Sequence, residues 1–461
     1  MDIANTLSGL RTKLRARYEQ LRASFWFVPT LMSVGAALLA LVTLAIDARL
    51  SDEVRSGLTW LYGGSPEGAR SLLSTVASSA ITVAGTTFSI TIAALSLASA
   101  QFGPRLLRTF VRDTGNQVVL GTFVATFLYC LLVVRTVRGL EDTRVVPHLS
   151  VTVGVLLAIA NLGVLIYFIH HVAMSIRADQ VIAAVGHDLD DVVAHLFPKQ
   201  LGHGLVAQRA GVEAPAAPAT AAPDAIPVAL DHDGYLQVLD IDTLMGLATE
   251  HDLVVTLLRR PGDFIVADEP AALVWPAGRV DDELREAITG AFILGRERSA
   301  QQDVLFVVNQ LVEVAARALS PGINDPFTAI TCLDRLGAVL CRVARLPLPD
   351  GRRYDEGGRL RVIAAPIRFD ELVDAAFDQI RHYGRDNLVV MGRLLETLGR
   401  VGEAAADEWR RAPLLRQARL AYEGSRDALS TDGDRETLEQ RYQATLTQLN
   451  RLERALGRGL L

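Results

Sequence analysis

The chain has 461 residues, of which 50% are hydrophobic and 21% are charged, and its mean hydropathy is +0.26. These values lie outside the usual range of soluble globular proteins and indicate a membrane protein. The formal net charge is -6, from 46 Lys and Arg against 52 Asp and Glu, and only 6% of the residues are aromatic. An acidic chain with few aromatic residues lacks the features of a nucleic-acid-binding protein, so we expect no nucleic-acid partner.

The first 24 residues form a basic arm, which carries Arg11, Lys13, Arg15, Arg17 and Arg22. Lys and Arg next to a membrane helix favour the cytoplasmic side of the membrane. The apolar run that follows is too long for a signal-peptide core and has no small-x-small cleavage site, so we predict that it stays as an anchor. The N-terminus is therefore expected in the cytoplasm.

Four apolar stretches are long enough to cross the hydrocarbon core of a bilayer, which takes about 20 helical residues. They cover roughly residues 25–46, 72–100, 117–135 and 149–173, and we assign residues 25–176 to a four-helix transmembrane domain. Four crossings return the chain to the cytoplasm, where the rest of it is expected. The three cysteines, Cys130, Cys332 and Cys341, fit neither a disulfide framework nor a paired metal site, which agrees with a reducing compartment.

The second apolar run, residues 71–100, is rich in hydroxyl side chains rather than leucine. At 100° per residue, most of these side chains fall on one face of a helix. The candidate pore-lining residues on this face are Ser74, Ser78, Thr82, Thr86, Ser89 and Ser96. Such a face can line a water-filled ion path, because hydroxyls replace part of the hydration shell of an ion. Alternatively, small residues let helices pack closely while Ser and Thr bond back to their own helix.

Charged residues are absent from residues 25–46, 71–100 and 117–134. Coupled transporters generally need an ionisable group or an unwound helix near the membrane midplane, so a coupled pump is disfavoured. A basic cluster follows the second run, because Arg105, Arg108 and Arg112 share a helical face after Gly103 and Pro104. This cluster could bind anionic membrane lipids, attract anions to a path, or form a solvated interfacial surface.

The segment 177–227 is predicted to be a helical stalk, continuing the fourth membrane helix to Pro198, followed by an Ala/Pro-rich linker. His187, Asp191 and His195 form a strip on this helix that could hold a metal ion, but solvated residues are the simpler interpretation and we predict no metal site. Residues 228–300 read as a small α/β unit with alternating strands and turn signals. It has no phosphate-binding glycine motif, and we expect no cofactor.

Residues 301–461 are predicted to form a helical domain with a short strand at 359–367. Its first two helices, at 301–319 and 327–344, flank the segment SPGINDP at 320–326. Pro321 and Gly322 would end the first helix, and Asp325 before Pro326 would cap the second. We interpret this segment as a structural turn, in which Gly322 is important if it holds a positive φ. The alternative is a ligand site formed by Ser320, Gly322, Asn324 and Asp325.

The chain resembles the bacterial family of predicted membrane proteins known as domain of unknown function 2254. The resemblance covers most of the chain. It is carried by Thr87-Phe88-Ser89, Gln101-Phe102-Gly103-Pro104-Arg105, Gly234-Tyr235, Pro261-Gly262-Asp263-Phe264 and, most specifically, the nonapeptide Ala318-Leu319-Ser320-Pro321-Gly322-Ile323-Asn324-Asp325-Pro326. The resemblance implies an integral inner-membrane protein with a cytoplasmic C-terminal region, and it transfers no catalytic residues.

Two classes of function fit these observations. The first is a homo-oligomeric ion channel, with a preference for anions, that is regulated by its cytoplasmic region. The second is a non-conducting membrane-anchored sensor or scaffold. An enzyme is not expected, because the sequence has no catalytic carboxylate pair, nucleophile elbow or metalloprotease motif.

Overall fold

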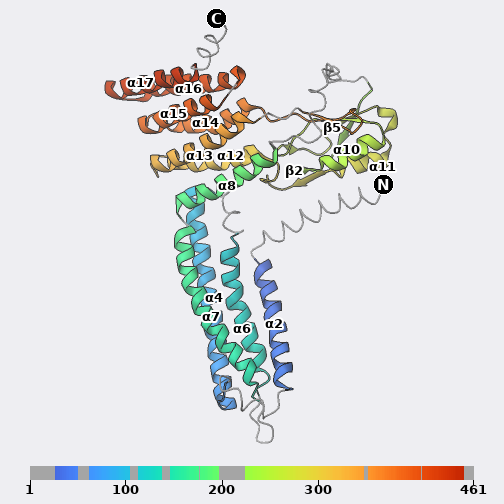
Figure 1. The fold of residues 1–461 in the computed structure, drawn as a ribbon, viewed down its shortest axis with the longest axis vertical. Coiled ribbons are helices and arrows are strands. Elements are labelled where there is room, and N and C mark those ends of the chain that lie inside the picture. Colours follow the sequence, from blue (N-terminus) through green and yellow to red (C-terminus); the bar gives the residue numbers. More distant parts are fainter. Residues whose placement is uncertain are drawn as a thin grey trace. The chain divides into compact units, whose positions relative to one another are not determined.

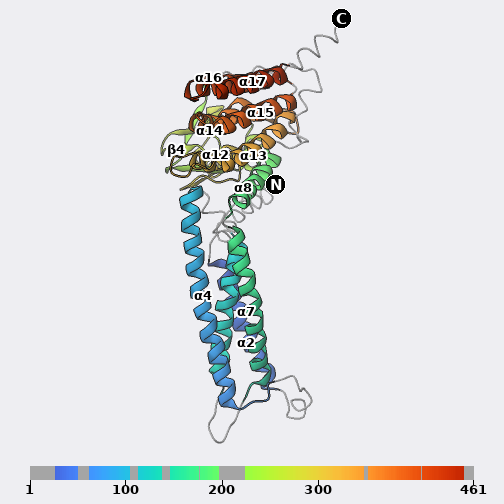
Figure 2. The ribbon, with the colours of Figure 1, turned by 90° about the vertical axis from the view of Figure 1, so that its left-hand side faces the viewer.

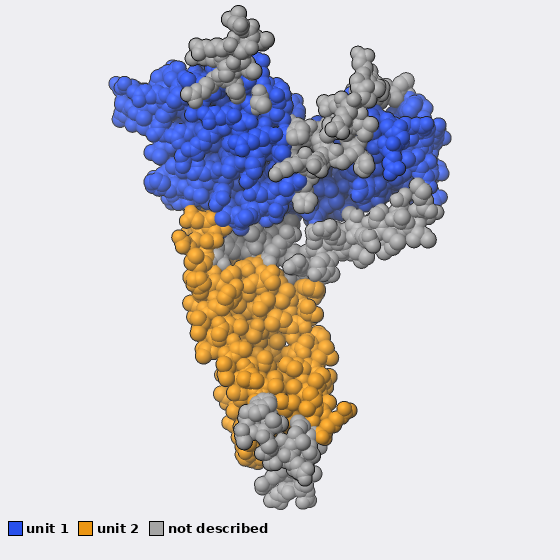
Figure 3. Space-filling view, in the orientation of Figure 1, with its two compact units in different colours: residues 1–15, 181–461 blue, residues 16–180 orange. Residues whose placement is uncertain are grey.

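The computed structural model describes residues 26–49, 62–103, 113–137, 146–175, 177–196, 224–346, 351–405 and 407–450. The described chain divides into two compact units, one ending at Gln180 and the other beginning at Val181 (Figure 3). The unit that ends at Gln180 is orange in Figure 3 and is called the first unit here; it contains the membrane helices. The unit that begins at Val181 is blue and is called the second unit; it contains a mixed α/β module and a helical module. This composition confirms the predicted fold class of an α-helical membrane protein followed by mixed α/β and helical structure.

Four helices among the described residues are long and apolar enough to span a membrane. They are α2 (Phe27–Asp47), α4 (Pro66–Phe102), α6 (Thr114–Val134) and α7 (His148–Ser175) (Figure 1). Helix α4 begins earlier than predicted, because Ser65 accepts a hydrogen bond from the backbone of Gly68 and Pro66 occupies the first helical position. It ends where Gly103 adopts a φ of 108°, a conformation that favours glycine.

Helix α6 lies at the centre of this unit and contacts α2, α4 and α7. Two glycines allow close approach of helices: a Cβ at Gly121 would lie 3.2 Å from Pro29 of α2, and a Cβ at Gly154 of α7 would lie 2.7 Å from Leu73 of α4. The outer surfaces of α2 and α7 instead expose large aliphatic side chains. Small residues inside and aliphatic residues outside are what a bundle in lipid requires.

A buried polar network joins α2, α6 and α7 at one end of the bundle. The carboxylate of Asp47 accepts hydrogen bonds from the backbone of Leu149 and Ser150, at 3.0 and 2.9 Å, and from the Ser150 hydroxyl at 2.7 Å. The hydroxyl of Tyr129 donates to the Ser150 carbonyl at 3.0 Å and lies 3.1 Å from that of Thr43. Asp47 therefore caps the first turn of α7 from another helix.

The predicted continuation of the fourth membrane helix to Pro198 is wrong. Helix α7 ends at Ser175, and a separate helix, α8 (Ala178–Leu196), follows. The interruption has a physical reason, because α8 is amphipathic and buries its apolar side chains within the second unit. These buried residues are Val181, Ile182, Val185, Leu189, Val192 and Val193.

The α/β module consists of two sheets with three short helices. The first sheet has the order β1 (Ile226–Ala229), β5 (Pro270–Trp275), β3 (Val254–Leu257), β8 (Leu360–Ile363) and β7 (Arg352–Tyr354), and the second has β4 (Phe264–Ile265), β2 (Gly234–Leu239) and β6 (Phe292–Gly295). The helices are α10 (Ile241–Glu250), η2 (Ala277–Arg279) and α11 (Asp282–Thr289). In each sheet, a strand that precedes α10 pairs with at least one strand that follows it. The two sheets and the helices α10 and α11 share one apolar core.

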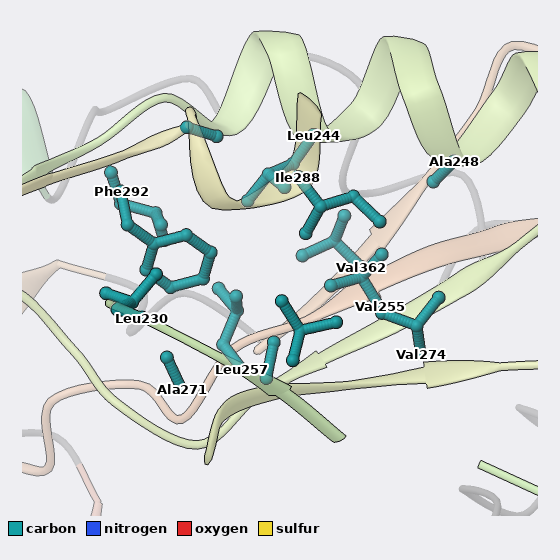
Figure 4. Close-up of a cluster of buried hydrophobic side chains, with 14 of the residues drawn as sticks. Leu230, Leu244, Ala248, Val255, Leu257, Ala271, Val274, Ile288, Phe292 and Val362 are labelled. Atoms are coloured by element: carbon teal, nitrogen blue, oxygen red, sulfur yellow. The ribbon is translucent and has the colours of Figure 1, made fainter. Parts of the chain in front are cut away.

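Strand β8 joins this module from far along the chain. It pairs in parallel with β3, where Val255 lies opposite Val362. Figure 4 shows Val255 and Val362 in the same apolar cluster as Leu244 of α10 and Ile288 of α11. The module therefore includes residues 352–363, which lie beyond the predicted boundary at residue 300.

A buried arginine fixes β8 in place. The guanidinium of Arg361, which is 4% exposed, donates to Asp355 and to Asp252, both at 2.7 Å. Asp252 accepts a further hydrogen bond from Arg279 at 2.7 Å. The hydrogen bonds from Arg361 and then Arg279 lower the pKa of Asp252 to about 2. Charge-assisted hydrogen bonds thus link β8 to Asp252, which precedes β3, and to Asp355, which follows β7.

The remaining helices form three antiparallel hairpins stacked on one another (Figures 1 and 2). The hairpins are α12 (Val304–Ala318) with α13 (Pro326–Arg345), α14 (Phe369–Tyr383) with α15 (Leu388–Ala404), and α16 (Glu408–Ala428) with α17 (Asp432–Leu449). Helices α12, α14 and α16 form one layer, and α13, α15 and α17 form the other. A Cβ at Gly337 would lie 2.4 Å from the methyl group of Thr397, so glycine permits the close contact of α13 with α15. Helix pairs also stack in two layers in helical-repeat proteins.

Replacing Asp47 with Ala should destabilise the membrane unit by about 1–2 kcal/mol, because the first turn of α7 loses its cap. Asp47→Asn should recover part of this loss, since an amide oxygen still accepts. Thermal unfolding in detergent, with the exposed Ser74→Ala as a control, checks this expectation. Equal stability of Asp47→Ala and the wild type would mean that the cap is dispensable.

Replacing Arg361 with Met should lower the Tm at neutral pH, because Asp252 and Asp355 lose their main partner. The pKa of Asp252 is depressed, so its contribution to stability is complete above the ordinary carboxyl pKa of about 3.9. That contribution is lost as the pH falls through about 2. The Tm difference between wild type and variant should therefore shrink between these pH values. Arg296→Met, at an exposed side chain of the same module, is the matched control, and a pH-independent difference would contradict the assignment.

Candidate functional site: the hydroxyl face of helix α4

The two faces of α4 have different surroundings within the first unit. One face is lined by alanines and is buried, with Ala69, Leu73 and Ala77 in one core cluster and Ala84 in another. The first cluster includes Tyr129 and Cys130 of α6 and Val151 of α7. Alanine allows backbones to approach closely in a membrane, where packing rather than exclusion of water holds helices together. The small-residue face of α4 is therefore already used within its own chain.

The opposite face of α4 carries the predicted pore-lining residues, and all of them are exposed. They are Ser74, Ser78, Thr82, Thr86, Ser89 and Ser96. Gly85 lies on the same side, and no atom lies within 4 Å of a Cβ placed there. The structure therefore brings these residues together on one face, as the spacing predicts, but the face lies on the outside of the bundle of a single chain.

Three of the six hydroxyl groups on this face donate their protons to the helix itself. Thr82 donates to the Ser78 carbonyl at 2.7 Å, and Thr86 donates to that of Thr82 at 3.1 Å. Ser89 donates to the Gly85 carbonyl at 2.9 Å. These bonds to the preceding turn satisfy the donors in an apolar environment. The oxygen lone pairs remain available to accept hydrogen bonds from water or from a neighbouring helix.

Ionisable groups that the sequence analysis did not single out lie at the other end of the bundle from Asp47. Asp113 caps α6 by accepting from the Gly115 backbone at 2.8 Å, and its second oxygen lies 2.6 Å from Nε2 of His171 on α7. The ring of Tyr167 stacks on His171, with centroids 5.2 Å apart. The sequence Asp-Thr-Gly at the start of the third apolar run could have indicated that Asp113 caps this helix. The predicted cluster of Arg105, Arg108 and Arg112 lies outside the described residues.

The SPGINDP segment forms the tight turn of the first hairpin. Asp325 caps α13, accepting from the backbone of Thr328 at 3.2 Å and from its hydroxyl at 2.6 Å. The Ser320 hydroxyl donates to the Arg317 carbonyl at 2.6 Å. The side chains of Ser320 and Asp325 thus form hydrogen bonds with residues of α12 and α13, respectively. The two side chains do not converge on a common point.

Gly322 does not hold the positive φ that would make it important to the turn. Asn324 has a φ of 49°, whereas Gly322 is not among the described residues with positive φ. A Cβ at Gly322 would meet no atom within 4 Å. Asn tolerates the left-handed conformation better than most residues, which explains its position before Asp325. The glycine of this turn is therefore less important than the asparagine.

The second motif of the chain, Pro261-Gly262-Asp263-Phe264, joins the α/β module to the hairpin stack. Gly262 has a φ of 99°, and a Cβ there would lie 2.3 Å from the carboxylate of Asp303. Asp303 is buried, caps α12 at Phe306, and pairs with Arg298 at 2.7 Å. Burial raises the pKa of Asp303. Sequence analysis did not identify Asp303 or Arg298, and we assign them a structural role.

Within the described residues, no group of three or more His, Cys, Asp or Glu side chains is close enough to hold a metal ion. His187 and Asp191 are exposed on α8. The candidate site of the described chain is therefore the hydroxyl face of α4.

Asp325→Ala should destabilise the second unit by about 1 kcal/mol through loss of the cap. Asn324→Ala should cost a similar amount, roughly 1 kcal/mol, because alanine is strained at positive φ. Asn324→Gly should be close to neutral, and Gly322→Ala is the matched control with no expected effect. Chemical denaturation of the full chain measures these differences. If Asp325→Ala keeps full stability but loses a measurable activity, the turn is a ligand site.

Comparison with known proteins agrees with these observations. Uncharacterized proteins of Mycobacterium bovis and Mycobacterium tuberculosis are 32% identical to this chain over 439 residues, which covers 93% of this chain and 81% of theirs. No solved structure matches the chain. The family model described as predicted membrane protein, DUF2254, matches residues 22–400. The chain belongs to this family of predicted membrane proteins.

Proposed function

We propose that the protein is a homo-oligomeric ion channel of the bacterial inner membrane. The observation that carries this proposal is the outward hydroxyl face of α4. The opposite, alanine face is covered by α6 and α7, so the hydroxyl face can enclose a path only when several copies surround an axis. Closed symmetric rings of one chain are the common way to build such an axis.

The chemistry of the face suits a hydrated path. Thr82, Thr86 and Ser89 donate their protons to their own helix, so their oxygens accept hydrogen bonds from water. The face carries no charge, and the sign of the conducted ion would be set at the ends of the path. The arginines at positions 105, 108 and 112 favour anions by their field. We therefore propose a preference for anions.

The proposed topology has both termini in the cytoplasm. The basic N-terminal arm favours this side, and the even number of membrane helices returns the chain to it. The second unit, in which Cys332 and Cys341 are free thiols, would then lie in a reducing compartment. In this proposal it regulates the path and has no enzymatic activity of its own.

A second candidate function is a non-conducting membrane-anchored sensor or scaffold. It is favoured by the stack of three helical hairpins. Stacked hairpins offer extended surfaces for partner binding in helical-repeat proteins. Under this alternative, the hydroxyl face of α4 serves to pack copies together without leaving a path.

Replacing Ser78, Thr82 or Ser89 with Leu should lower ion flux in proteoliposomes several-fold, because leucine narrows and dehydrates the path. Oligomer size, measured by light scattering in detergent, should not change. Ile81→Leu, at an exposed aliphatic position of the same helix, is the matched control and should conduct normally. Dissociation of the oligomer by the Leu variants, or absence of conduction by the wild type at every voltage tried, would favour the scaffold.

A further inference from the structure

Three arginines of the α/β module meet at the carboxylate of Asp252, which precedes β3. Arg361 and Arg279 donate to its two oxygens, both at 2.7 Å. Nη1 of Arg359 lies 3.6 Å from the oxygen that accepts from Arg361. Arg361 also pairs with Asp355. Three arginines therefore share two carboxylates, and the cluster has an excess of one positive charge.

Two of these guanidinium groups are exposed and keep unused hydrogen-bond donors. The side chains of Arg279 and Arg359 are 49% and 72% exposed. Within the described residues, the side chain of Arg279 donates only through Nη1, to the carboxylate and carbonyl of Asp252, and that of Arg359 donates no hydrogen bond. In the same part of the structure, Glu250 and Glu356 form no ion pair with these arginines. An oxyanion therefore finds available donors beside both oxygens of Asp252.

A tryptophan lies at the same end of the five-stranded sheet. Trp275 ends β5 and lies opposite Val254 of β3, two residues after Asp252. The adjoining residues on β5, β3 and β8 all point into the core of the module (Figure 4). They are Val274, Val255 and Val362. Because successive residues of a strand point to opposite faces of a sheet, Trp275 and Arg361 share the other face.

The ring of Trp275 is available for stacking. The residue is 45% exposed, and among the described residues its ring has no aromatic or guanidinium partner. The backbone N–H of Arg279 donates to the carbonyl of Pro276 at 3.2 Å, so one tight turn separates the ring from this arginine. Planar bases stack on exposed aromatic rings of this kind. The module thus presents a stacking surface next to two arginines.

We infer that Trp275, Arg279 and Arg359 bind a soluble nucleotide. The phosphate oxygens accept hydrogen bonds from the two arginines, because the planar fork of a guanidinium matches the geometry of a phosphate. The base stacks on the ring of Trp275. Asp252 holds Arg279 and Arg359 near each other before the ligand arrives, which lowers the cost of ordering them on binding. The inference rests on the second unit alone and does not depend on whether α4 lines a conduction path.

Both parts of the cluster are needed to name the ligand class. The two arginines alone would accept any phosphate or sulfate, and an exposed tryptophan alone would accept any planar ring. A nucleotide carries a phosphate and a planar ring in one molecule. The glycine-rich loop that the sequence lacks is not required here, because side chains rather than backbone N–H groups hold the phosphates.

Isothermal titration calorimetry on the full chain in detergent tests the inference, with ADP and inorganic pyrophosphate as probes that differ by the nucleoside. We expect ADP to bind at least about five-fold more tightly, which is the lower end of the contribution of one stacked base. Arg359→Met should weaken the binding of ADP about ten-fold, through loss of charge-assisted hydrogen bonds. Trp275→Leu should remove the preference for ADP. Arg296→Met, at an exposed arginine of the same module, is the matched control and should bind ADP normally.

Three results would overturn the inference. The first is that the wild type does not bind ADP, and the second is that neither variant changes the affinity for ADP. The third is equal affinity of the wild type for ADP and pyrophosphate, because Trp275 then contributes nothing. Unchanged thermal unfolding verifies that the variants keep the fold. Where Arg359→Met lowers the Tm, Arg359→Lys replaces it, since lysine keeps the charge but lacks the planar fork and should also weaken binding.

Discussion

The packing of the alanine face of α4 against α6 and α7 is the constraint on which the membrane unit depends. In lipid there is no hydrophobic force between helices, so the face that packs is the one that allows the closest approach. Ala69, Ala77 and Ala84 provide that face. Once it is buried, the geometry of a helix leaves the hydroxyl residues outside. In the proposed channel, the hydroxyl face of another copy of the chain lies opposite this face.

The ends of the membrane helices are fixed by polar groups rather than by apolar packing. Asp47 caps α7 across the bundle, and Asp113 caps α6 while contacting His171. Both carboxylates lie at helix termini, where unpaired backbone donors attract negative charge. The hydrocarbon-spanning parts can therefore remain uncharged while the length and register of the bundle are still specified.

The second unit is held together by contacts between segments far apart in the chain. Strand β8 completes a sheet whose other strands, apart from β7, precede the hairpin stack, and Arg361 anchors it through Asp252 and Asp355. On the other side, Gly262 allows the PGDF turn to approach Asp303 at the start of α12. Module and stack are thus joined at both ends of the first hairpin. A displacement of α12 and α13 would therefore also displace the five-stranded sheet that contains β8.

Much of the fold could be predicted from the sequence because it follows from local patterns. The four apolar runs, the helices on either side of SPGINDP and the strand around Val362 all appear within a few residues of their predicted positions. Hydrophobic length and periodicity report directly on elements of this kind. The break between α7 and α8 was missed, because a helical pattern continues through it and the reason for the break is the packing of α8.

Two features follow from the sequence alone: the four helices that are long and apolar enough to span a membrane, and the shared face of the hydroxyl groups of α4. Both depend only on residue type and helical period. The tertiary structure shows that this face lies outside the bundle of one chain, since its position depends on which neighbours cover the alanines. It also decided that Asn324 rather than Gly322 holds the positive φ, and that Arg361 and Asp252 meet. These contacts join residues far apart in the chain, and the separation is 109 positions for Arg361 and Asp252. No local pattern specifies them, because they arise only when the segments pack together.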